Sequence, residues 1–343
     1  MSIVDVVIVG AGPIGLELAV CLKHAGADYV HLDAGQVGQT VAWYPKQTRY
    51  FSSPERIAIA GVPLVTPDQT KATREQYLAY LHGIVEQFDL PIRTFEPVTA
   101  VSRDAGTGRF TVTSAKKTYH AQHVVLAIGD MHLPRMLDVP GEDLPHVSHY
   151  FDEPHQYFRQ NLLIVGGKNS AVEAALRCHA AGARVTISYR GNRFDQKSIK
   201  YWLLPEIEAL IEHDQIGFVP TSHVTRIEQE HVTLRQGGKP VRVPADFVLL
   251  LTGYTQDKTL FESAGVTLDG DNRAPRHDPA TMMTDVPNLY VAGTAAAGTQ
   301  NAFKLYIENS HPHVVKIVGS ITGSPPPPEL VNTAAQTYGL AES

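Results

Sequence analysis

The chain has 343 residues, of which 43% are hydrophobic, and this length fits two domains better than one. Its formal net charge of −6 argues against a nucleic-acid partner or an anionic membrane surface. No apolar run reaches the ~20 residues of a membrane span, and the first strand begins too early for a signal peptide, so a cytoplasmic protein is expected. Cys21 and Cys178 are the only cysteines, which excludes a disulfide framework and a Cys-x-x-Cys pair. Helical spacing predicts that both thiols are buried.

A glycine-rich turn follows the apolar run of residues 6–9 and opens a helix. Gly10 allows the chain to leave the strand tightly, Gly12 lets backbone amides approach a pyrophosphate, and Gly15 lets the helix pack on the strand. Pro13 and Ile14 lie between these glycines, at the expected helix N-terminus, where unpaired amides and the helix dipole attract phosphate. The turn therefore predicts a dinucleotide site.

The second strand of this unit is predicted at residues 29–33 and ends at Asp33. A carboxylate at this spacing from the glycines binds ribose hydroxyls, so Asp33 and the adjacent Ala34 are assigned to the site of the first dinucleotide, FAD. Residues 36–75 are rich in prolines and aromatics and are expected to cover the isoalloxazine ring. A buried strand over residues 124–129 ends at Gly129, which is assigned to the FAD site and where the chain is expected to leave the first domain.

A second glycine turn follows the apolar residues 162–165. It departs from the usual pattern, because Lys168 and Ser170 stand where the second and third glycines are expected. A lysine can offer its ammonium group to a phosphate. This turn predicts a second dinucleotide site, formed by Gly166, Gly167, Lys168, Asn169 and Ser170.

The residues after the next strand, 184–188, indicate which nicotinamide binds. Arg190 and Arg193 stand where an acid would favour NAD, and arginine suits a 2′-phosphate through charge-assisted hydrogen bonds. NADPH is therefore expected rather than NADH, the alternative being that both arginines are simply solvated. Gly253, at the end of the strand near residues 246–252, is assigned to the same site.

The chain then returns to the first domain through a strand that ends at Gly293 and Thr294, which are assigned to the FAD site. The predicted fold class is α/β, with two Rossmann-like domains and one inserted into the other. The expected limits are 1–129 plus 285–323 for FAD and 130–284 for NADPH. A proline-rich tail over 324–343 is expected to be mobile.

Several stretches resemble a known family: residues 10–16, 50–53, 140–150, 165–171, 198–200, 252–254 and 306–309. Over nearly the whole chain, to about residue 322, the sequence is similar to thioredoxin-reductase-like flavoproteins, and more closely to the bacillithiol disulfide reductase family. The resemblance implies FAD, NADPH, a low-molecular-weight disulfide as acceptor, and a homodimer. In that family the first glycine turn contains a cysteine, where this chain has Ile14, and thioredoxin reductases carry an aspartate where Thr294 stands.

Because the turn cysteine is missing, the acceptor stays open. A disulfide would have to be reduced directly by the flavin; the alternatives are a ferredoxin, flavodoxin or quinone acceptor, or a non-catalytic redox sensor that binds both nucleotides. His311 and His313 fall in a segment that the resemblance places beside the flavin, where a histidine can donate a proton. His146 and His149 lack a third ligand, so no metal site is expected.

Overall fold

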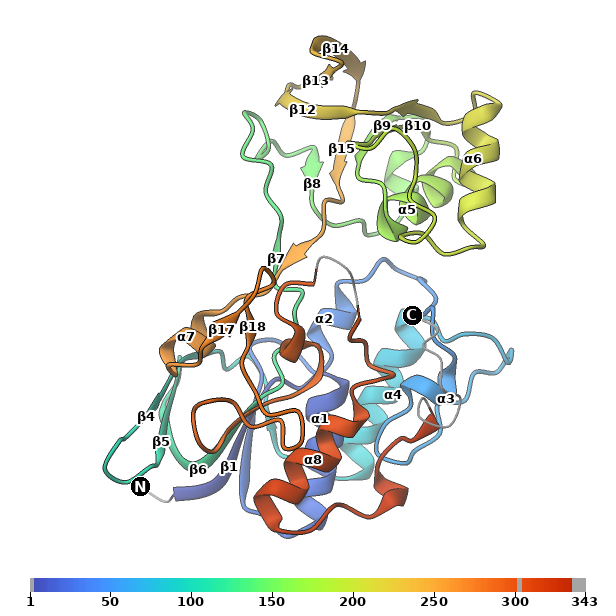
Figure 1. Cartoon of the computed structure of the whole chain (residues 1–343). Helices are drawn as coiled ribbons and strands as arrows, with labels where there is room; N and C mark the ends of the chain where they lie inside the picture. The colour runs from blue at the N-terminus through green and yellow to red at the C-terminus, as the bar shows by residue number, and fades with distance from the viewer. Residues whose placement is uncertain (1–2, 301–303, 335–343) are drawn as a thin grey trace. The chain divides into compact units, whose positions relative to one another are not determined.

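The computed structural model describes residues 3–300 and 304–334. The chain divides into two compact units, the first drawn from Met1–Leu133 and Tyr254–Ser343 and the second from Pro134–Gly253. Each unit is built on its own Rossmann-like sheet with helices against it, so the predicted α/β class with an inserted domain is confirmed (Figure 1).

The sheet of the first unit has the order β3-β2-β1-β6-β5-β4, with β19 also paired to β6. Its strands are β1 (Ile3–Val9), β2 (Tyr29–Leu32), β3 (Ile92–Arg93), β4 (Val98–Arg103), β5 (Phe110–Ser114), β6 (Thr118–Leu126) and β19 (Leu289–Val291). Strands β1, β2, β3 and β19 run parallel to their neighbours, whereas β4, β5 and β6 form an antiparallel meander. The carboxyl ends of β1, β6 and β19 therefore meet at one edge.

The long strand β6 belongs to both parts of this sheet. Its first half, residues 118–121, pairs antiparallel with β5, and residues 124–126 pair in parallel with β19. Residues 6–8 of β1 and 124–126 of β6 are fully buried, as a strand covered on both faces requires.

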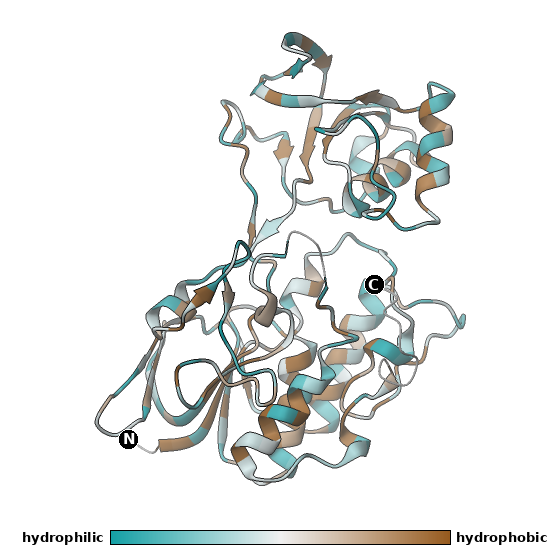
Figure 2. Cartoon of the chain, in the orientation of Figure 1, coloured by the Kyte–Doolittle hydropathy of each residue, from teal (hydrophilic) through white to brown (hydrophobic). Residues whose placement is uncertain are grey.

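Three longer helices of the first unit, α1 (Pro13–His24), α4 (Arg74–Gln87) and α8 (His311–Thr322), pack together, with α1 contacting both others (Figure 1). Residues 14–22 of α1 are buried throughout, whereas α4 and α8 each combine buried and exposed residues and show hydrophobic and hydrophilic positions in Figure 2. Helix α4 begins with a capping box, in which the Thr73 hydroxyl accepts from the Gln76 amide while the Gln76 side chain accepts from the Thr73 amide.

Shorter elements complete this unit: α2 (Gln39–Ala42), α3 (Pro54–Ile57), β16 (Tyr254–Thr255), α7 (Thr259–Ser263), β17 (Leu268–Asp269), β18 (Ala274–Pro275) and the 3-10 turns η2 (Gly293–Ala297) and η3 (Pro328–Leu330). Strand β16 pairs with β7 (Leu133–Pro134), so the two chain crossings between the units run side by side.

The boundary of the inserted domain differs from the prediction. Residues 130–133 and 254–284 were expected in the second domain, yet they belong to the first unit. For residues 254–284 the reason is helix α7, which lies against β4: Phe261 is fully buried in the first core, and the Ser263 hydroxyl accepts a hydrogen bond from the Val101 amide at 3.1 Å.

The predicted mobile tail is also corrected for residues 324–334. Val331 is buried, and the Asn332 side chain donates to the carbonyls of Glu55 and Ala58 at 2.8 and 2.6 Å. A Cβ on Gly61 would lie 1.7 Å from the Glu329 carbonyl oxygen, so the tail passes directly over that glycine. Residues 335–343 lie outside the described part.

The second unit is organised around a five-stranded parallel sheet of order β11-β10-β9-β15-β8. Its elements are β8 (Val147–Ser148), η1 (His155–Tyr157), β9 (Asn161–Val165), α5 (Asn169–Ala180), β10 (Arg184–Ser188), α6 (Leu204–Glu212), β11 (Gly217–Val219) and β15 (Phe247–Leu250), with a separate meander of β12 (Ser222–Ile227), β13 (His231–Gln236) and β14 (Lys239–Pro244). Strand β9 leads through a glycine turn into α5, which is the Rossmann arrangement.

Candidate dinucleotide and electron-transfer site

The first glycine turn joins β1 to α1, and each of its glycines has a distinct environment. Gly10 has φ +109°, and a Cβ there would lie 2.3 Å from the Ala127 carbonyl oxygen. A Cβ on Gly15 would lie 2.0 Å from the Gly10 carbonyl oxygen. At Gly12 a Cβ would meet nothing within 4 Å. Glycine at positions 10 and 15 is thus required by packing, whereas Gly12 faces open space that a ligand can enter.

Helix α1 begins directly after this space. Pro13 is its first residue, and its fixed φ and missing amide suit that position. Ile14 is buried and reaches across to β19, since a Cβ on Gly293 would lie 3.5 Å from its side chain. The predicted residues of the first turn and of the β19 end are therefore brought together.

Asp33 lies just past the end of β2 and faces the same turn. Its Oδ2 accepts from the Ala11 amide at 2.6 Å and its Oδ1 from the Gly35 amide at 2.7 Å. Burial raises the pKa of this carboxyl group, and the two amide bonds act against that rise. A carboxylate has further lone pairs, so ribose hydroxyls fit here, while Ala34 is exposed beside it.

The other side of the turn lies at the ends of β6 and β19, where sequence reasoning missed a residue. Asp130 follows the predicted Gly129 directly and is only 7% exposed. Its Oδ2 accepts from Gln300 Nε2 at 2.9 Å, and it is hydrogen-bonded to the Thr294 side chain. Asp33 was identified because it ends a strand at the expected spacing from the first glycine turn. Asp130 has no such spacing and is marked only by its place directly after Gly129, at the end of another strand.

Gln256 joins the segments that follow β6 and β19. Its Nε2 donates to the carbonyls of Gly129 and Ala295 at 2.9 and 3.0 Å. Its Oε1 is buried and accepts no hydrogen bond from the described residues. The open space at Gly12 and this free buried acceptor are features that a bound dinucleotide with its own donors fits.

The second glycine turn joins β9 to α5 and is packed differently. Gly166 has φ +150°, and a Cβ there would lie 2.6 Å from the Leu251 carbonyl oxygen. A Cβ on Gly167 would lie 2.3 Å from the ring of Tyr189, so this glycine is required by the aromatic ring above it. Neither glycine leaves the open space found at Gly12.

The remaining residues of this turn surround the start of α5. Lys168 is exposed, with extended backbone at the helix N-cap, and Ser170 is exposed in the first turn. Asn169 Oδ1 accepts from the Lys200 amide at 2.8 Å, which anchors the loop after β10. The helix N-terminus with Lys168 beside it is the feature that suits phosphate.

Arg190 and Arg193 follow the carboxyl end of β10 and are exposed. No acidic side chain stands between them. Gly253, with φ +98°, lies beyond β15, the strand next to β9, so it shares the carboxyl edge of the sheet with the glycine turn.

Comparison with known proteins agrees with this geometry. The family model described as "Pyridine nucleotide-disulphide oxidoreductase" matches residues 7–293. The chain belongs to the pyridine nucleotide-disulphide oxidoreductase family. It is an FAD-dependent NAD(P)H oxidoreductase of the thioredoxin-reductase-like class.

Within this family the chain is similar to the bacilliredoxin reductase Bdr of Bacillus subtilis (strain 168), with 37% identity over 316 residues, 92% of this chain and 96% of the relative. It is also similar to the structure of the bacillithiol disulfide reductase Bdr (YpdA) from Staphylococcus aureus, with 35% identity, a TM-score of 0.88, and coverage of 94% and 99%. A ferredoxin–NADP reductase from Ignicoccus hospitalis (strain KIN4/I) is more distant, at 26% identity over 84% of this chain and 89% of the relative. The predicted resemblance to the bacillithiol disulfide reductase family is confirmed.

Unlike dithiol members of the oxidoreductase class, this chain places no thiol in the site. Cys21 and Cys178 are both buried inside helices, and burial raises the pKa of each thiol. A buried thiol with a raised pKa stays protonated and is a poor nucleophile. The prediction that both are packing residues agrees with the structure.

His311 of this oxidoreductase lies in a buried ion pair with Glu17 of α1. Its Nδ1 donates to Glu17 Oε2 at 2.7 Å and its Nε2 donates to the Arg56 carbonyl at 3.1 Å. Burial acts to lower the pKa of His311, but the charge and hydrogen bond of Glu17 outweigh it, and the pKa is raised. Because both ring nitrogens face acceptors, the ring is held as an imidazolium.

Glu17 also holds the two segments that cover α1. Its Oε1 accepts from the amides of Ala60 and Asn332, each at 3.1 Å. The pair therefore joins α1, α8, the loop at residue 60 and the tail, which is a structural role for His311.

His313 contacts the turn after β19. Its Nδ1 accepts from the Gly293 amide at 3.2 Å, and burial, followed by the charge of Lys316, lowers the pKa of His313 to about 4. A ring that accepts at Nδ1 and is neutral at physiological pH positions the β19 turn. Both ring nitrogens of His311 are bonded to acceptors of the protein. A neutral His313 that accepts at Nδ1 carries its proton on Nε2, so its role as a proton donor stays a prediction.

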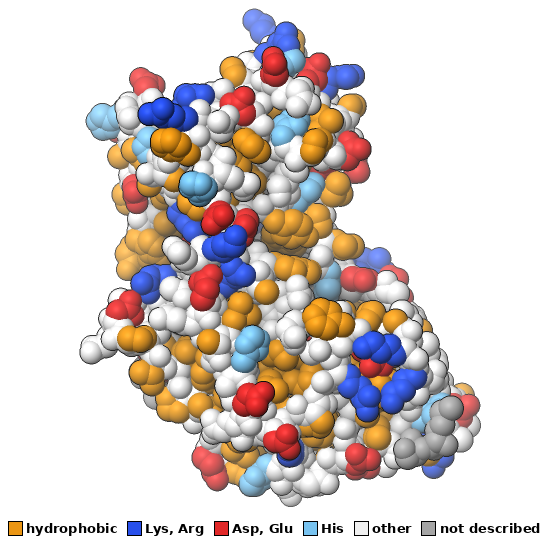
Figure 3. Space-filling model, turned by 180° about the vertical axis from the view of Figure 1, so that it is seen from behind, with side chains coloured by type: hydrophobic (Ala, Val, Ile, Leu, Met, Phe, Trp, Pro, Cys, Tyr) orange, Lys and Arg blue, Asp and Glu red, His pale blue; other side chains and the backbone are white. Residues whose placement is uncertain are grey.

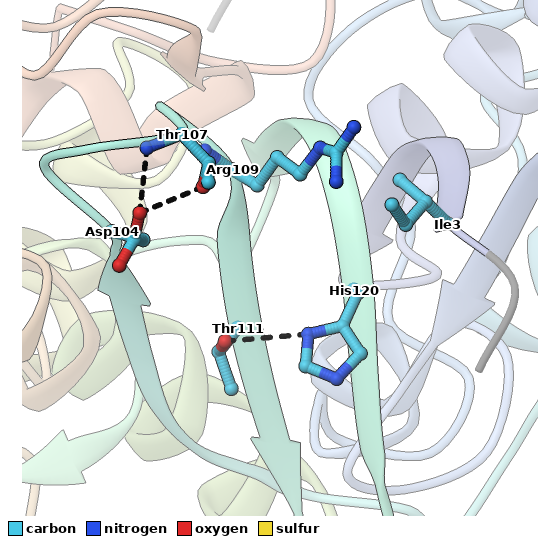
Figure 4. Close-up of a pocket in the computed structure, with 6 residues that line it drawn as sticks. All are labelled: Ile3, Asp104, Thr107, Arg109, Thr111 and His120. Carbon is cyan, nitrogen blue, oxygen red and sulfur yellow. Dashed lines mark hydrogen bonds between the residues drawn. The ribbon is translucent and has the colours of Figure 1, made fainter.

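A pocket of about 370 Å³ lies elsewhere, on the meander of β4, β5 and β6 (Figure 4). Its polar groups already serve the hairpin: Asp104 accepts from the Thr107 amide and hydroxyl at 2.6 and 2.8 Å, and Thr111 bonds His120 at 3.4 Å. None of the predicted cofactor residues lines it.

The described residues contain no cluster of three metal-ligating side chains, and none of their helices has the length and apolarity to cross a bilayer. On the face seen in Figure 3, basic and acidic side chains are interspersed rather than gathered into a field of one sign.

Proposed function

We propose that this oxidoreductase takes electrons from NADPH and delivers them to a low-molecular-weight thiol disulfide of the bacillithiol type. The similarity to proteins named bacillithiol disulfide reductase and bacilliredoxin reductase, over nearly the full length of both chains, supports this acceptor class. The relatives named for ferredoxin are less similar.

The observation that carries the proposal is the pair of glycine turns with different surroundings. The first unit offers open backbone at Gly12 and a carboxylate at Asp33, which suit the pyrophosphate and ribose of FAD. The second offers a helix N-terminus, Lys168 and two exposed arginines, which suit the phosphates of NADPH. When bound, FAD supplies the chemistry that links a two-electron donor to the acceptor.

In this scheme the residues of the chain bind the two cofactors and orient them. Arg190 and Arg193 pair with the 2′-phosphate of NADPH, and Ile14 presents an apolar side chain where the family has a thiol. Because no cysteine stands in the first turn, no mixed disulfide with the protein forms, and the acceptor disulfide has to reach the flavin itself.

Anaerobic stopped-flow spectroscopy tests the acceptor. The protein is reduced with NADPH and then mixed with bacillithiol disulfide, with a bacilliredoxin disulfide, or with oxidised ferredoxin or flavodoxin. We expect reoxidation by the small disulfide. Reoxidation only by a one-electron carrier would contradict the proposal and favour the ferredoxin alternative. Flavin reduction without any competent acceptor would favour the sensor.

A matched variant isolates the missing thiol. Ile14→Cys replaces the buried side chain that packs on Gly293 with the residue of the family pattern. The variant is expected to reduce with NADPH at the wild-type rate and to be reoxidised faster by the disulfide. A homodimer, the assembly implied by the resemblance, is tested in the same preparations by light scattering.

A further inference from the structure

Asp130 is a buried acid with no role in the scheme above. It lies past Gly129 at the carboxyl end of β6, and its carboxylate is held by Gln300 at 2.9 Å and by the Thr294 side chain. Gln300 is fixed in turn, because its Oε1 accepts from the amides of Lys304 and Leu305 at 2.9 and 3.0 Å. These hydrogen bonds fix the orientation of the Asp130 carboxylate at the carboxyl edge of the sheet, as a binding site requires.

The sheet order shows which part of FAD this carboxylate faces. Strand β1, whose turn at Gly12 suits the pyrophosphate, lies between β2 and β6. Asp33 at the end of β2 suits the ribose of the adenosine half. The other half of FAD, which consists of a ribityl chain with three hydroxyl groups and the isoalloxazine ring, must then extend to the opposite side of β1. The polar groups at that side come from the ends of β6 and β19, where Asp130 and Thr294 lie.

We propose that Asp130 binds a ribityl hydroxyl of FAD and supplies, from the segment after β6, the carboxylate that Thr294 lacks in the turn after β19. Thioredoxin reductases carry an aspartate at the position of Thr294, and here the threonine hydroxyl instead bonds an aspartate from the neighbouring strand. The proposal rests on FAD binding, which is part of the proposed function, and is independent of the acceptor.

This arrangement couples FAD binding to a proton. Without a ligand, burial raises the pKa of Asp130, against the hydrogen bonds from Gln300 and Thr294. The other titratable groups that act on this site are His132 on the same segment and Tyr44 from the loop after α2. A ribityl hydroxyl donates to the ionised carboxylate, so FAD is bound more tightly by the deprotonated acid. The negative charge also disfavours reduced, anionic flavin.

The test compares Asp130→Asn with a matched control, Glu142→Gln. Glu142 is a buried acid of similar exposure whose oxygens accept from the amides of Leu137 and Asp138 in the second unit. FAD retention is measured by the recovery of flavin fluorescence when full-length holoprotein is diluted, without NADPH or acceptor. The midpoint potential of the bound flavin is measured on the same samples.

We expect Asp130→Asn to weaken FAD binding by about tenfold to a hundredfold, the effect of losing one hydrogen bond to a charged group. The variant should also raise the flavin midpoint potential and remove the loss of FAD affinity that we expect of wild type as the pH is lowered. Glu142→Gln should change none of the three.

Unchanged affinity, potential and pH dependence in Asp130→Asn would overturn the proposal. Equal loss of FAD in both variants would also overturn it, since that would be a general loss of folding. If Asp130→Asn does not fold, two other measurements test the assignment: the FAD affinity of wild type as a function of pH, and FAD retention in Thr294→Val. An FAD affinity that does not change with pH, together with undiminished FAD retention in Thr294→Val, contradicts the assignment. Failure of the disulfide as acceptor would leave every one of these measurements unaffected.

Discussion

The open space at Gly12 makes a prediction that separates cofactor binding from folding. Gly12→Ala adds one methyl group where it would meet no atom within 4 Å, at a backbone φ of −77° and ψ of −179° that alanine adopts readily. Gly15→Ala adds the same group 2.0 Å from the Gly10 carbonyl oxygen. The two substitutions are chemically identical and lie three residues apart.

The first substitution is expected to change the free energy of FAD binding, and the second the free energy of unfolding. At a compatible position, replacing glycine by alanine stabilises a fold by about 0.4–1 kcal/mol, because the unfolded chain loses entropy. The methyl group at position 12 nevertheless keeps the pyrophosphate from the turn amides. Loss of two charge-assisted hydrogen bonds, at roughly 1.5–3 kcal/mol each, weakens FAD binding by at least a hundredfold. At position 15 the methyl group must displace backbone, which costs about 3 kcal/mol or more of folding stability.

Both effects are read from two measurements on each purified variant: flavin content by absorbance and thermal unfolding after FAD is removed. Gly12→Ala should be colourless and unfold at or slightly above the temperature of flavin-free wild type, while Gly15→Ala should unfold well below it. A Gly12→Ala protein that retains one FAD per chain would refute the assignment of this turn to the pyrophosphate.

Two further outcomes are expected. Arg190→Ala should lower the ratio of kcat/KM for NADPH to that for NADH by about tenfold to a hundredfold. Arg184→Ala, at the opposite end of β10, should leave this ratio unchanged. An unchanged ratio in Arg190→Ala would contradict the 2′-phosphate assignment. Glu17→Gln breaks the buried pair with His311 and should cost about 3 kcal/mol in urea unfolding, with exposed Glu55→Gln as control. Since the pKa of His311 is raised from 6.5, the stabilisation by this pair is complete below pH 6.5 and is lost as the pH rises through the raised value; stability that increases across that range would exclude an imidazolium.

Much of the fold was predictable because the signals are local. A strand of apolar residues, a glycine turn and an amphipathic helix specify the Rossmann start at Gly10 and again at Gly166 from neighbouring residues alone. Asp33 was found in the same way, because its distance along the chain from the glycines is fixed by the helix between them.

The errors share a different cause, since each depends on contacts between distant segments. Residues 254–284 follow the last strand of the second unit in sequence, but Phe261 finds its core in the first. The proline-rich tail has the composition of a mobile segment, yet Asn332 is held by Glu17, 315 residues away. The contacts of His311 with α1 and α3 are long-range in the same way and could not be predicted, whereas its role beside the flavin, which rests on the resemblance, stays a prediction.

The two departures at the flavin edge, Ile14 and Thr294, have opposite consequences for this chain. A lost thiol cannot be replaced by a neighbour, because both cysteines are buried within helices and burial raises their thiol pKa. A lost carboxylate can be replaced, because the ends of β6 and β19 are adjacent and an acid on either strand reaches the same space. If Asp130 binds FAD as proposed, flavin binding tolerates a change of residue position that thiol chemistry does not. For this reason we expect the chain to keep the first half of the family reaction unchanged and to carry out the second without a protein sulfur atom.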